Sequence, residues 1–404
     1  MDKIARNENS GTCNCALCGS SDLRIFYTAK NVPASCNRLW KNKDDALNCP
    51  KGDIKLAFCR SCTFISNIAI EPEKNQYDSG YDNSLFYSAH FQEFARKLTS
   101  KLVEQYGLYN KNIVEIGGGK VDFLSSLKEL GKNCAFRFNP FYPKFESSNQ
   151  EANSPLSSIT RSFPFLDEGK KVDFVFSYHE LEHMNNPKIL LKYLWMLLDK
   201  STSPHVFFSV PNALKAFEEG DYSDIIYEHV SYFTIPSLHF LFSLCGFEIS
   251  SVQETRGEIF DSIHVDATRK QGKMPNLNPI SELAIRQIDQ IIQKFYAKTL
   301  ENIRKRSQQL TKLLDKGNRI VIWGAGARGV TFLNILKDQR IKYAVDINPH
   351  KHGMYVPGTG QKIVVPEFLL DYRPDFIILA NPAYKKEIEL LVDSLGIVAR
   401  YLLI

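Results

Sequence analysis

The feature that most constrains the fold is a glycine-rich turn between a short apolar strand and a helix. Asn112–Ile116 predicts the strand, Gly117–Gly119 forms the turn, and Val121–Leu130 predicts the helix. Glycines at this place permit positive φ angles and let a ligand approach the backbone closely. A strand, a glycine turn and a helix in this order are typical of nucleotide-binding α/β sheets. The turn therefore predicts both the fold class and the position of a pocket.

Around this turn, apolar strands alternate with amphipathic helices. The other expected strands are Cys134–Phe138, Val172–Ser177 and His205–Val210, and the expected helices are Phe91–Tyr106, Pro187–Leu198 and one around Pro236–Cys245. Strands that alternate with helices indicate a parallel, doubly wound sheet.

A second unit of alternating strands and helices occupies the C-terminal end. Pro275–Pro279 ends the central region, and the charged amphipathic stretch Ile280–Lys316 predicts one long helix or two. The elements expected after it are the strand Ile320–Trp323, the turn Gly324–Gly329, a helix to about Lys337, the strands Lys342–Asp346 and Asp375–Leu379, and the helix Lys385–Leu395. This length suffices for half of a dinucleotide-binding fold.

Seven of the nine cysteines precede residue 63, and four of them form two CxxC pairs. The pairs are Cys15–Cys18 and Cys59–Cys62. Two such knuckles make a tetrahedral site of four thiolates that suits Zn²⁺, and four protein ligands leave no open position for catalysis. We therefore expect a structural zinc site. Cys13 is spaced awkwardly for this site, and buried free thiols are expected at Cys134 and Cys245.

Charge and hydropathy exclude several classes of protein. The formal net charge of +5 is small for 404 residues and gives no argument for binding nucleic acid. No apolar run is long enough for a transmembrane helix, and the N-terminus lacks the apolar stretch of a secretory signal. Together with many cysteines, this favours a reducing compartment, and we expect a cytoplasmic protein without membrane contact. The oligomeric state cannot be read from the sequence, and a monomer is consistent with it.

Polar residues follow two of the expected strands at the sheet edge where α/β proteins bind ligands. His179 to His183 follow the strand at 172–177, and Tyr227-Glu228-His229 lies beyond the strand at 205–210. At the glycine turn, Glu115 precedes the glycines. A carboxylate there repels phosphate and suits a cationic or amine-bearing ligand such as S-adenosylmethionine (SAM).

The order of these motifs resembles the sugar C-methyltransferase family of SAM-dependent enzymes. The resemblance runs from Cys15 to the C-terminus, and its motifs are the CxxC pairs, the aromatic run Tyr77–Tyr87, Glu115–Leu124, Glu182-His183, Glu228-His229, Trp323-Gly-Ala-Gly and Asp346–Gly353. It implies an α/β protein with a zinc-binding module at 1–75, a central doubly wound Rossmann-like methyltransferase domain at 76–275, a connecting helix at 276–316 and a smaller Rossmann-like domain at 317–404.

The resemblance also implies methyl transfer from SAM to carbon 3 of a nucleotide-linked 4-keto deoxysugar, a small-molecule substrate. Such a reaction needs a base beside the carbonyl and groups that stabilise the enolate. The implied roles are His229 as base, His183 polarising the enolate and Glu228 orienting an imidazole, with Tyr227 as a further catalytic residue. The implied cofactor residues are Glu115, Gly117, Gly119, Asn139 and Tyr81, and the implied substrate residues are Gly326, Arg328 and Lys351.

Three positions depart from that family's pattern. Val121 stands at the place of the usual third glycine, Asn139 at the place of the acid that binds the ribose, and Ile226 at the place of a tyrosine. An amide at position 139 can still donate and accept hydrogen bonds, but it loses the charge-assisted component of about 1–2 kcal/mol. The alternative function is therefore a catalytically altered or inactive methyltransferase-like protein that binds a nucleotide sugar or another ligand.

Two further motifs suggest other enzymes. His179–His183 spells the HExxH signature of zinc proteases, but it directly follows a strand, and no obvious third ligand follows it. Gly324-Ala-Gly326-Ala-Arg-Gly329 with Asp346 fits a dinucleotide fingerprint, which would make the chain an NAD-dependent oxidoreductase, but a second mononucleotide half has no room. The glycines at 326–329 instead predict either a phosphate site or a structural turn.

Overall fold

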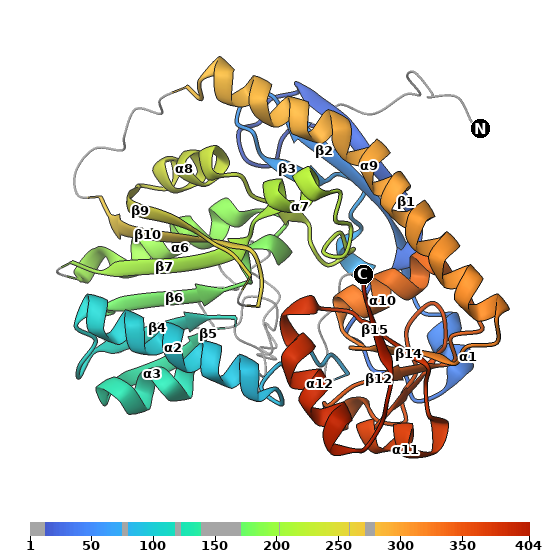
Figure 1. Ribbon diagram of the computed structural model, residues 1–404. Coiled ribbons are helices and arrows are strands. Elements are labelled where there is room, and N and C mark those ends of the chain that lie inside the picture. The colour runs from blue at the N-terminus through green and yellow to red at the C-terminus, as the bar shows by residue number, and fades with distance from the viewer. Residues whose placement is uncertain are drawn as a thin grey trace, which may run out of the picture.

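The computed structural model describes residues 13–74, 80–117, 123–138, 171–201, 203–257, 259–270 and 279–404. Within these residues the strands form three sheets. In Figure 1 they are the mainly blue N-terminal sheet, the cyan-to-yellow central sheet and the orange-to-red C-terminal sheet. No helix in the described part combines the length and apolarity needed to cross a membrane.

The N-terminal sheet has the order β1-β2-β3-β8 and is antiparallel. Its strands are β1 (Leu23–Pro33), β2 (Lys51–Cys59), β3 (Ile65–Asn67) and β8 (Ser231–Tyr232), and the short helix α1 (Lys43–Leu47) lies between β1 and β2. Strand β8 comes from the central part of the sequence, so it ties the cysteine-rich module to the segment that carries Glu228 and His229.

The central sheet has the order β5-β4-β6-β7-β10-β9. Its strands are β4 (Asn112–Ile116), β5 (Cys134–Phe138), β6 (Phe174–Tyr178), β7 (His205–Pro211), β9 (Phe247–Thr255) and β10 (Ser262–Arg269). Strands β5, β4, β6 and β7 are parallel, which confirms the doubly wound prediction for them. The prediction of a purely parallel sheet is wrong at one edge, because β10 is antiparallel to both β7 and β9.

Two apolar cores cover the two faces of this sheet. One contains buried residues of α2 (Ala89–Tyr106) and α3 (Phe123–Gly131), and the other contains those of α6 (Pro187–Leu197) and α8 (Ile235–Leu244). Helix ends are set by local capping: Ser88 Oγ accepts from Phe91 N, and Thr234 and Ser237 form a capping box. Figure 1 shows α2 and α3 below the sheet in cyan and α8 above it.

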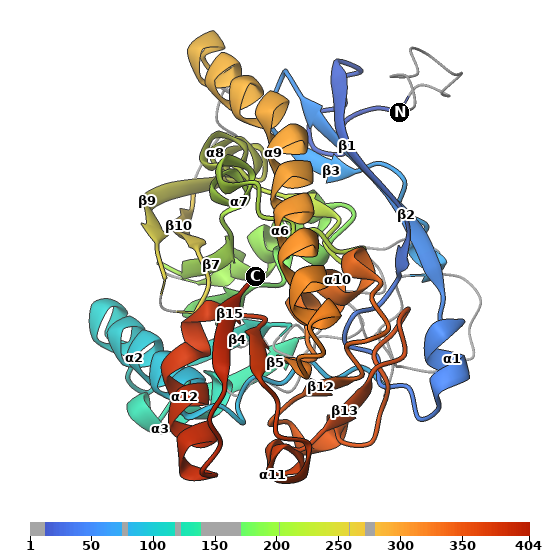
Figure 2. The ribbon, with the colours of Figure 1, turned by 45° about the vertical axis from the view of Figure 1, so that its right-hand side comes forward.

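Helix α9 (Glu282–Asp315) is one continuous helix of 34 residues, which decides between the two expectations for this stretch. At 1.5 Å per residue it is about 50 Å long. Figures 1 and 2 show it in orange, running along β1 towards the C-terminal domain. Ile292 and Phe295 pack into the core with β1 and α7 (Ala213–Glu219), and Leu310 and Leu314 join the C-terminal core. The helix therefore packs against both ends of the molecule.

The C-terminal sheet is parallel throughout, with the order β13-β12-β11-β14-β15. Its strands are β11 (Ile320–Trp323), β12 (Tyr343–Val345), β13 (Lys362–Val364), β14 (Phe376–Leu379) and β15 (Arg400–Leu403), and its helices are α10 (Ala327–Leu336), α11 (Leu369–Tyr372) and α12 (Lys385–Ser394). A Cβ at Gly329 would lie 1.9 Å from the Gly324 carbonyl oxygen, so this glycine allows α10 to approach the strand end.

Short 3₁₀ turns complete the described elements. They are η1 (Pro72–Lys74), η2 (Leu181–His183), η3 (Leu198–Lys200), η4 (Pro349–Lys351), η5 (Pro366–Phe368) and η6 (Pro382–Tyr384). The HExxH sequence thus begins directly after β6 and ends in one turn of 3₁₀ helix, which is not the long helix of a zinc protease.

Candidate active site

A cavity of about 460 Å³ lies between the central domain and the C-terminal domain. Its walls come from the carboxyl ends of β4 and β6, from the segment before α2, and from the turn between β11 and α10. This volume is in the usual range for small-molecule sites, and the carboxyl ends of parallel strands are where open α/β sheets bind ligands. The cavity therefore lies where the glycine turn predicted it.

On the central side, the wall begins at Glu115 and Gly117. Glu115 lines the cavity, is buried, and accepts a hydrogen bond from Arg137 Nε at 2.7 Å. Gly117 has φ of +76°, and a Cβ there would lie 2.0 Å from Glu180 Cδ, so only glycine fits. A buried carboxylate beside a turn without a side chain fits the amine and sugar hydroxyls of SAM. Gly119, Val121 and Asn139 lie outside the described residues, as does Tyr77.

Aromatic side chains also line the cavity, namely Tyr81, Tyr87, Phe91, Phe123 and Tyr178. The Tyr81 hydroxyl accepts a hydrogen bond from Asn37 Nδ2 at 3.5 Å. Burial raises the pKa of this phenol well above its ordinary value. Tyr81 is therefore neutral at physiological pH and can donate a hydrogen bond.

His183 and His229 lie together in the cavity wall, with ring centroids 4.9 Å apart. His183 Nδ1 is 3.0 Å from the Glu228 carbonyl oxygen, and His229 Nδ1 is 2.9 Å from the Asp224 carbonyl oxygen. A carbonyl only accepts, so each ring carries its proton on Nδ1 and presents the lone pair of Nε2.

Burial keeps both imidazoles uncharged. It lowers the pKa of His183 to about 3 and lowers the pKa of His229 below its ordinary value. Two groups oppose this at His229, because the Asp224 carboxylate and the Asp224 carbonyl both stabilise the imidazolium form. The pair thus provides two neutral bases, and His229 has the carboxylate neighbour that favours accepting a proton.

The side chain of Glu228 does not orient an imidazole. The chain turns at residues 227–228, and the Glu228 carboxylate points away to accept hydrogen bonds from Cys36 N at 2.9 Å and Ser35 Oγ at 3.2 Å. Burial raises its pKa to about 7. The orienting contact comes instead from the Glu228 backbone carbonyl. The expected role is therefore filled by this residue, but through its main chain.

Tyr227 is misplaced for the catalytic role expected of it. It is fully buried in the core between the N-terminal sheet and α9, and its hydroxyl accepts from Glu71 N at 2.8 Å. Ile226, one residue earlier, lines the cavity instead. A turn displaces neighbouring side chains to different sides, so a tyrosine shifted by one position cannot replace one at position 226.

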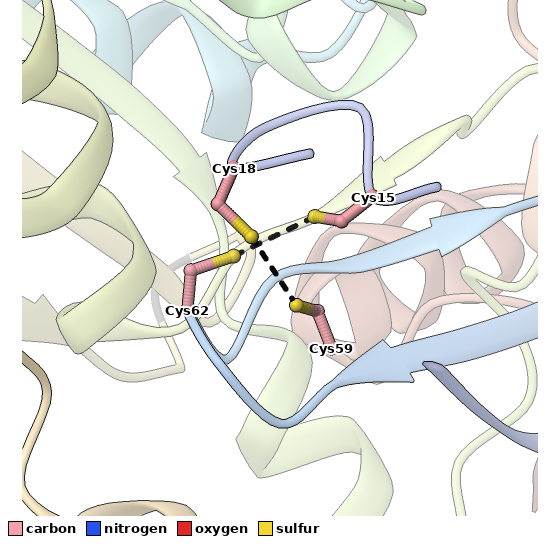
Figure 3. A group of neighbouring side chains, drawn as sticks. All are labelled: Cys15, Cys18, Cys59 and Cys62. Carbon is pink, nitrogen blue, oxygen red and sulfur yellow. Dashed lines mark hydrogen bonds between the residues drawn. The ribbon is translucent and has the colours of Figure 1, made fainter. Parts of the chain in front are cut away.

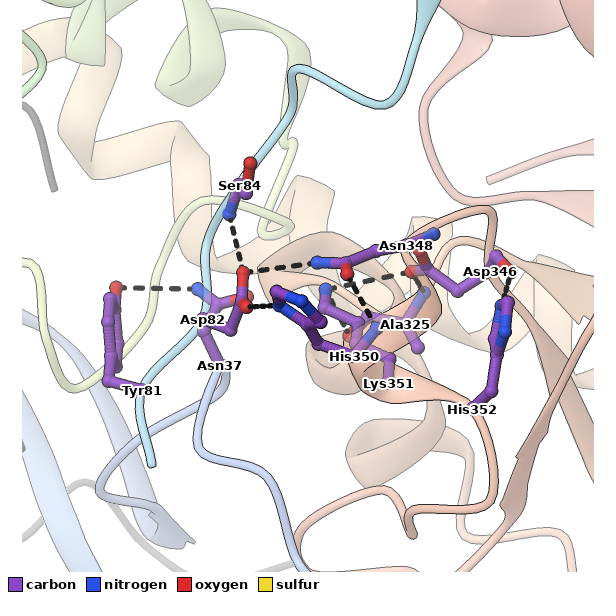
Figure 4. A network of polar contacts seen from close by, with 10 residues as sticks. All are labelled: Asn37, Tyr81, Asp82, Ser84, Ala325, Asp346, Asn348, His350, Lys351 and His352. Carbon is purple, nitrogen blue, oxygen red and sulfur yellow. Dashed lines mark hydrogen bonds and ion pairs between the residues drawn. The ribbon is translucent and has the colours of Figure 1, made fainter. Parts of the chain in front are cut away.

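On the C-terminal side, Gly326, Arg328 and Lys351 all line the cavity. Arg328 is not free, because its Nη2 is 2.8 Å from Asp224 Oδ2. Lys351 is buried, donates to the Ala325 carbonyl at 3.1 Å, and lies 3.6 Å from Asp346 Oδ2 (Figure 4). The structure therefore brings the three residues together, with both cations already paired to carboxylates.

Asp346 is also engaged within the protein. Its Oδ2 accepts from Ala325 N and its Oδ1 from Asn348 N, both at 2.9 Å (Figure 4). In a dinucleotide site this acid binds the ribose hydroxyls. Here it fixes the turn after β11, which argues against the oxidoreductase alternative.

The four cysteines of the CxxC pairs converge on one point (Figure 3). Their sulfur atoms lie within 4.8 Å of one another, with 3.6 Å between Cys15 and Cys62 and 3.5 Å between Cys18 and Cys59. A tetrahedral Zn²⁺ with bonds of 2.3 Å places its sulfurs about 3.8 Å apart. The donor set and its spacing fit zinc, and Cys13 is exposed outside it. Cys245 is a buried free thiol as predicted, whereas the prediction is wrong for Cys134, which is exposed.

Two groups of the site, Asp224 and Asn37, are not among the residues predicted from the sequence. Asp224 orients His229 through its carbonyl and pairs with Arg328 through its carboxylate. Asn37 reaches the cavity from the cysteine-rich module. The acidic pair Asp221 and Asp224 just before the Glu-His motif was a usable signal, whereas nothing in the sequence connects Asn37 with a cavity so far along the chain.

Comparisons with known proteins also indicate a methyltransferase. Residues 87–252 match the methyltransferase domain family, and residues 262–392 match the C-methyltransferase C-terminal domain family. C-methyltransferase NovU of Streptomyces niveus is 22% identical over 395 residues, which cover 93% of this chain and 90% of that protein.

Solved structures with some similarity include two methyltransferases. Magnesium protoporphyrin IX methyltransferase from Synechocystis PCC 6803 with bound SAH is 14% identical, covering 48% of this chain and 90% of that chain with a TM-score of 0.30. A SAM-dependent methyltransferase from Aquifex aeolicus is 12% identical; the match covers 44% of this chain and 97% of that chain, with a TM-score of 0.28.

Proposed function

This chain is a SAM-dependent methyltransferase of the sugar C-methyltransferase family, and we propose a substrate for it. The substrate is a nucleotide-linked 4-keto deoxysugar, and the methyl group goes to the carbon beside its carbonyl. The observation that carries the proposal is that two uncharged imidazoles, His183 and His229, line one cavity with the Glu115–Gly117 strand end and the glycine turn of the C-terminal domain.

Bound SAM supplies a methyl group on a positively charged sulfur, which is a good leaving group. Glu115 and the backbone at Gly117 are the groups that would hold it. His229 removes the proton next to the sugar carbonyl through Nε2, because the Asp224 carboxylate beside it stabilises the imidazolium that forms. Alignment of the carbon with the methyl group and control of this proton are the protein's main contributions.

The hydrogen bond from His183 Nδ1 to the Glu228 carbonyl changes the role implied for His183. A neutral ring held this way presents a lone pair, so it accepts hydrogen bonds and cannot donate one to an enolate oxygen. We assign it the binding of a sugar hydroxyl. The neutral hydroxyl of Tyr81 is a donor that lines the cavity, and we assign it to the enolate oxygen.

The C-terminal domain is proposed to hold the nucleotide part of the substrate. Gly326 is the N-cap of α10, a helix of 10 residues, and helix N-termini favour phosphate. A Cβ at Gly326 would meet only Asn37 Oδ1 at 3.7 Å and Lys351 Nζ at 3.8 Å, so the space beside the helix end faces a cation. A structural Zn²⁺ on Cys15, Cys18, Cys59 and Cys62 is proposed for the N-terminal module.

The test is an assay with SAM carrying a ¹³C-methyl group and a panel of nucleoside-diphosphate 4-keto deoxysugars. We expect one panel member to gain a ¹³C-methyl group bonded to carbon, located by NMR through its couplings to the ring protons. Label on oxygen, or no SAM consumption with any panel member, contradicts the proposed substrate. Calorimetry with SAM alone separates failure to bind the cofactor from failure to accept the sugar.

A further inference from the structure

A second cavity, of about 40 Å³, lies behind His229. It shares Glu182, His229, Asp224 and Arg328 with the main cavity, so these side chains form the partition between the two. Roughly 10–15 Å³ is enough to hold one water molecule where polar partners are present. The small cavity is therefore large enough for water.

In the part of the chain that the structure describes, the buried carboxyl group of Glu182 in this partition has no hydrogen-bond partner. Its side chain is 2% exposed, and neither carboxyl oxygen has a hydrogen-bond partner among the described residues. The nearest candidate cation is His179, whose Nδ1 lies 3.9 Å from Oε1, but burial lowers the pKa of His179 to about 3 and leaves it uncharged. Burial accordingly raises the pKa of Glu182 well above its ordinary value, so it carries a proton.

The carboxyl group of Glu182 lies close to both imidazoles. One oxygen of Glu182 and one nitrogen each of His183 and His229 are within 4.8 Å of one another. Neither carboxyl oxygen of Glu182 makes a direct hydrogen bond to a described residue, so one bridging water suits the connection to the two rings.

The small cavity continues from Glu182 towards the surface. Its other acidic lining residues are Asp221, Asp224, Asp261 and Glu219. The Asp224 carboxylate forms an ion pair with Arg328. Burial raises the pKa of Asp221 above its ordinary value. Glu219 on α7 has a side chain that is 53% exposed, so the lining reaches solvent there.

We propose that Glu182 and the small cavity form the exit path for the proton that His229 removes from the sugar. This inference rests on the proposed function, because it needs His229 as the base. Substrate and SAM fill the main cavity during the reaction, so the proton on His229 must leave by another side.

The carbon–hydrogen bond breaks, its proton goes to His229 Nε2, and its electron pair remains on carbon and forms the bond to the methyl group, while the sulfur of SAM keeps the electrons of the old bond. The imidazolium then gives its proton through water to one oxygen of Glu182, whose other oxygen releases its own proton into the small cavity. His229 and Glu182 both return to their starting forms.

The variant that tests this relay is E182Q, which preserves the size of the side chain but cannot pass a proton in this way. In rapid-quench experiments with SAM and the accepted sugar, we expect a first turnover within about threefold of the wild-type rate. The following steady state should be at least tenfold slower, because His229 stays protonated. Without SAM in D₂O, the exchange of the sugar proton for deuterium should also fall at least tenfold.

Two comparisons keep the result specific. E218Q changes an exposed glutamate outside both cavities and should match the wild type in every readout. E182D retains a carboxyl group and should recover part of the exchange, and it also serves if E182Q does not fold.

Three outcomes overturn the relay. The first is an E182Q enzyme with wild-type exchange and turnover, and the second is a first turnover that slows as much as the steady state. The third is a second metal ion in the purified protein, beyond that of the four cysteines, that is lost in E182Q, because Glu182, His183 and His229 would then be its ligands. If the wild type itself neither exchanges nor methylates any sugar in the panel, the proposed function fails and the relay falls with it.

Discussion

Nδ1 of His350, in the C-terminal domain, is 2.8 Å from Oδ2 of Asp82, a buried residue in the segment before α2 (Figure 4). The other carboxylate oxygen of Asp82 accepts from Asn348 Nδ2 and from Ser84 N, both at 3.0 Å. Asp82 therefore joins the tyrosine-bearing segment of the cavity to the C-terminal domain.

The network continues in both directions from Asp82. Asn348 N donates to Asp346, which fixes the turn at Ala325, while Asp82 N donates to the carbonyl of Asn37 at 2.9 Å. Tyr81, next to Asp82, faces the cavity. The position of Tyr81, which is proposed to donate to the reacting sugar, is thus fixed by the domain proposed to bind the nucleotide.

Replacing Asp82 with asparagine should weaken this connection. The D82N side chain has one acceptor oxygen in place of two, which costs about 1.5–3 kcal/mol for a lost hydrogen bond to a charged group. We expect KM for the sugar to rise about fivefold or more and kcat to fall less. Steady-state kinetics check this, and D44N, in the exposed helix α1, is the control. A change confined to KM for SAM would contradict the assignment.

Replacing His229 should remove the base while the cofactor remains bound. A positioned general base contributes about 10²–10⁴-fold to rate. We expect H229N to lose at least a hundredfold in kcat and to bind SAM within threefold of the wild type, as measured by calorimetry. H183N should lose less in kcat and more in KM for the sugar, because His183 is proposed to bind a hydroxyl. Equal losses in kcat for both variants would argue against separate roles.

The motifs with short, fixed spacing were predicted well from the sequence. The CxxC pairs converge as expected, because each knuckle is a local structure and only one partner pair was available. Gly117 also has the positive φ angle expected of it. The strands missed were all four of the N-terminal sheet (β1, β2, β3 and β8) and β9, β10, β13 and β15. Of these, β1, β9 and β15 are edge strands with many partly exposed residues. Their burial pattern comes from neighbours that the sequence alone does not reveal.

Side-chain direction was the least predictable part of the site. Tyr227, Glu228 and His229 are consecutive, yet only His229 reaches the cavity, while Glu228 points to Cys36 and Tyr227 enters the core with Gly52. A motif gives the residue types but not the rotation of the chain at a turn.

The dependence of activity on pH should report the lowered pKa of His229. A base with the ordinary histidine value of about 6.5 loses half of its neutral form at that pH. Because burial lowers the pKa of His229, we expect kcat/KM to remain level from pH 8 to pH 6.5 and to fall only at lower pH. A midpoint at or above pH 6.5 would show that the imidazole is not buried in the working enzyme.

Stability should respond to the same burial at His183. Its pKa in the folded state is about 3, below the ordinary value of 6.5, so the unfolded chain binds the proton more readily. Its contribution is therefore present above pH 6.5 and decreases as the pH falls from 6.5 towards 3. Urea unfolding between pH 7.5 and pH 5 should show a steeper loss for the wild type than for H183N. Burial raises the pKa of Glu228 to about 7, so its contribution to stability is instead lost as the pH rises towards 7. Because both proteins contain Glu228, the difference between their free energies of unfolding reports His183.

Removal of the proposed zinc should unfold the N-terminal module and then disturb the active site. Cys15, Cys59 and Cys62 belong to the same apolar core as Phe64 and Phe233, and β8 links this module to His229. We expect about one zinc per chain by elemental analysis, and its loss together with a lower melting temperature in C59S. C134S, which changes an exposed thiol outside the cluster, should retain the metal. Because a structural ion offers no open position, C59S should lose activity only in proportion to the unfolded fraction. A C59S protein that remains folded, with normal SAM binding but no turnover, would instead indicate that this metal takes part in catalysis.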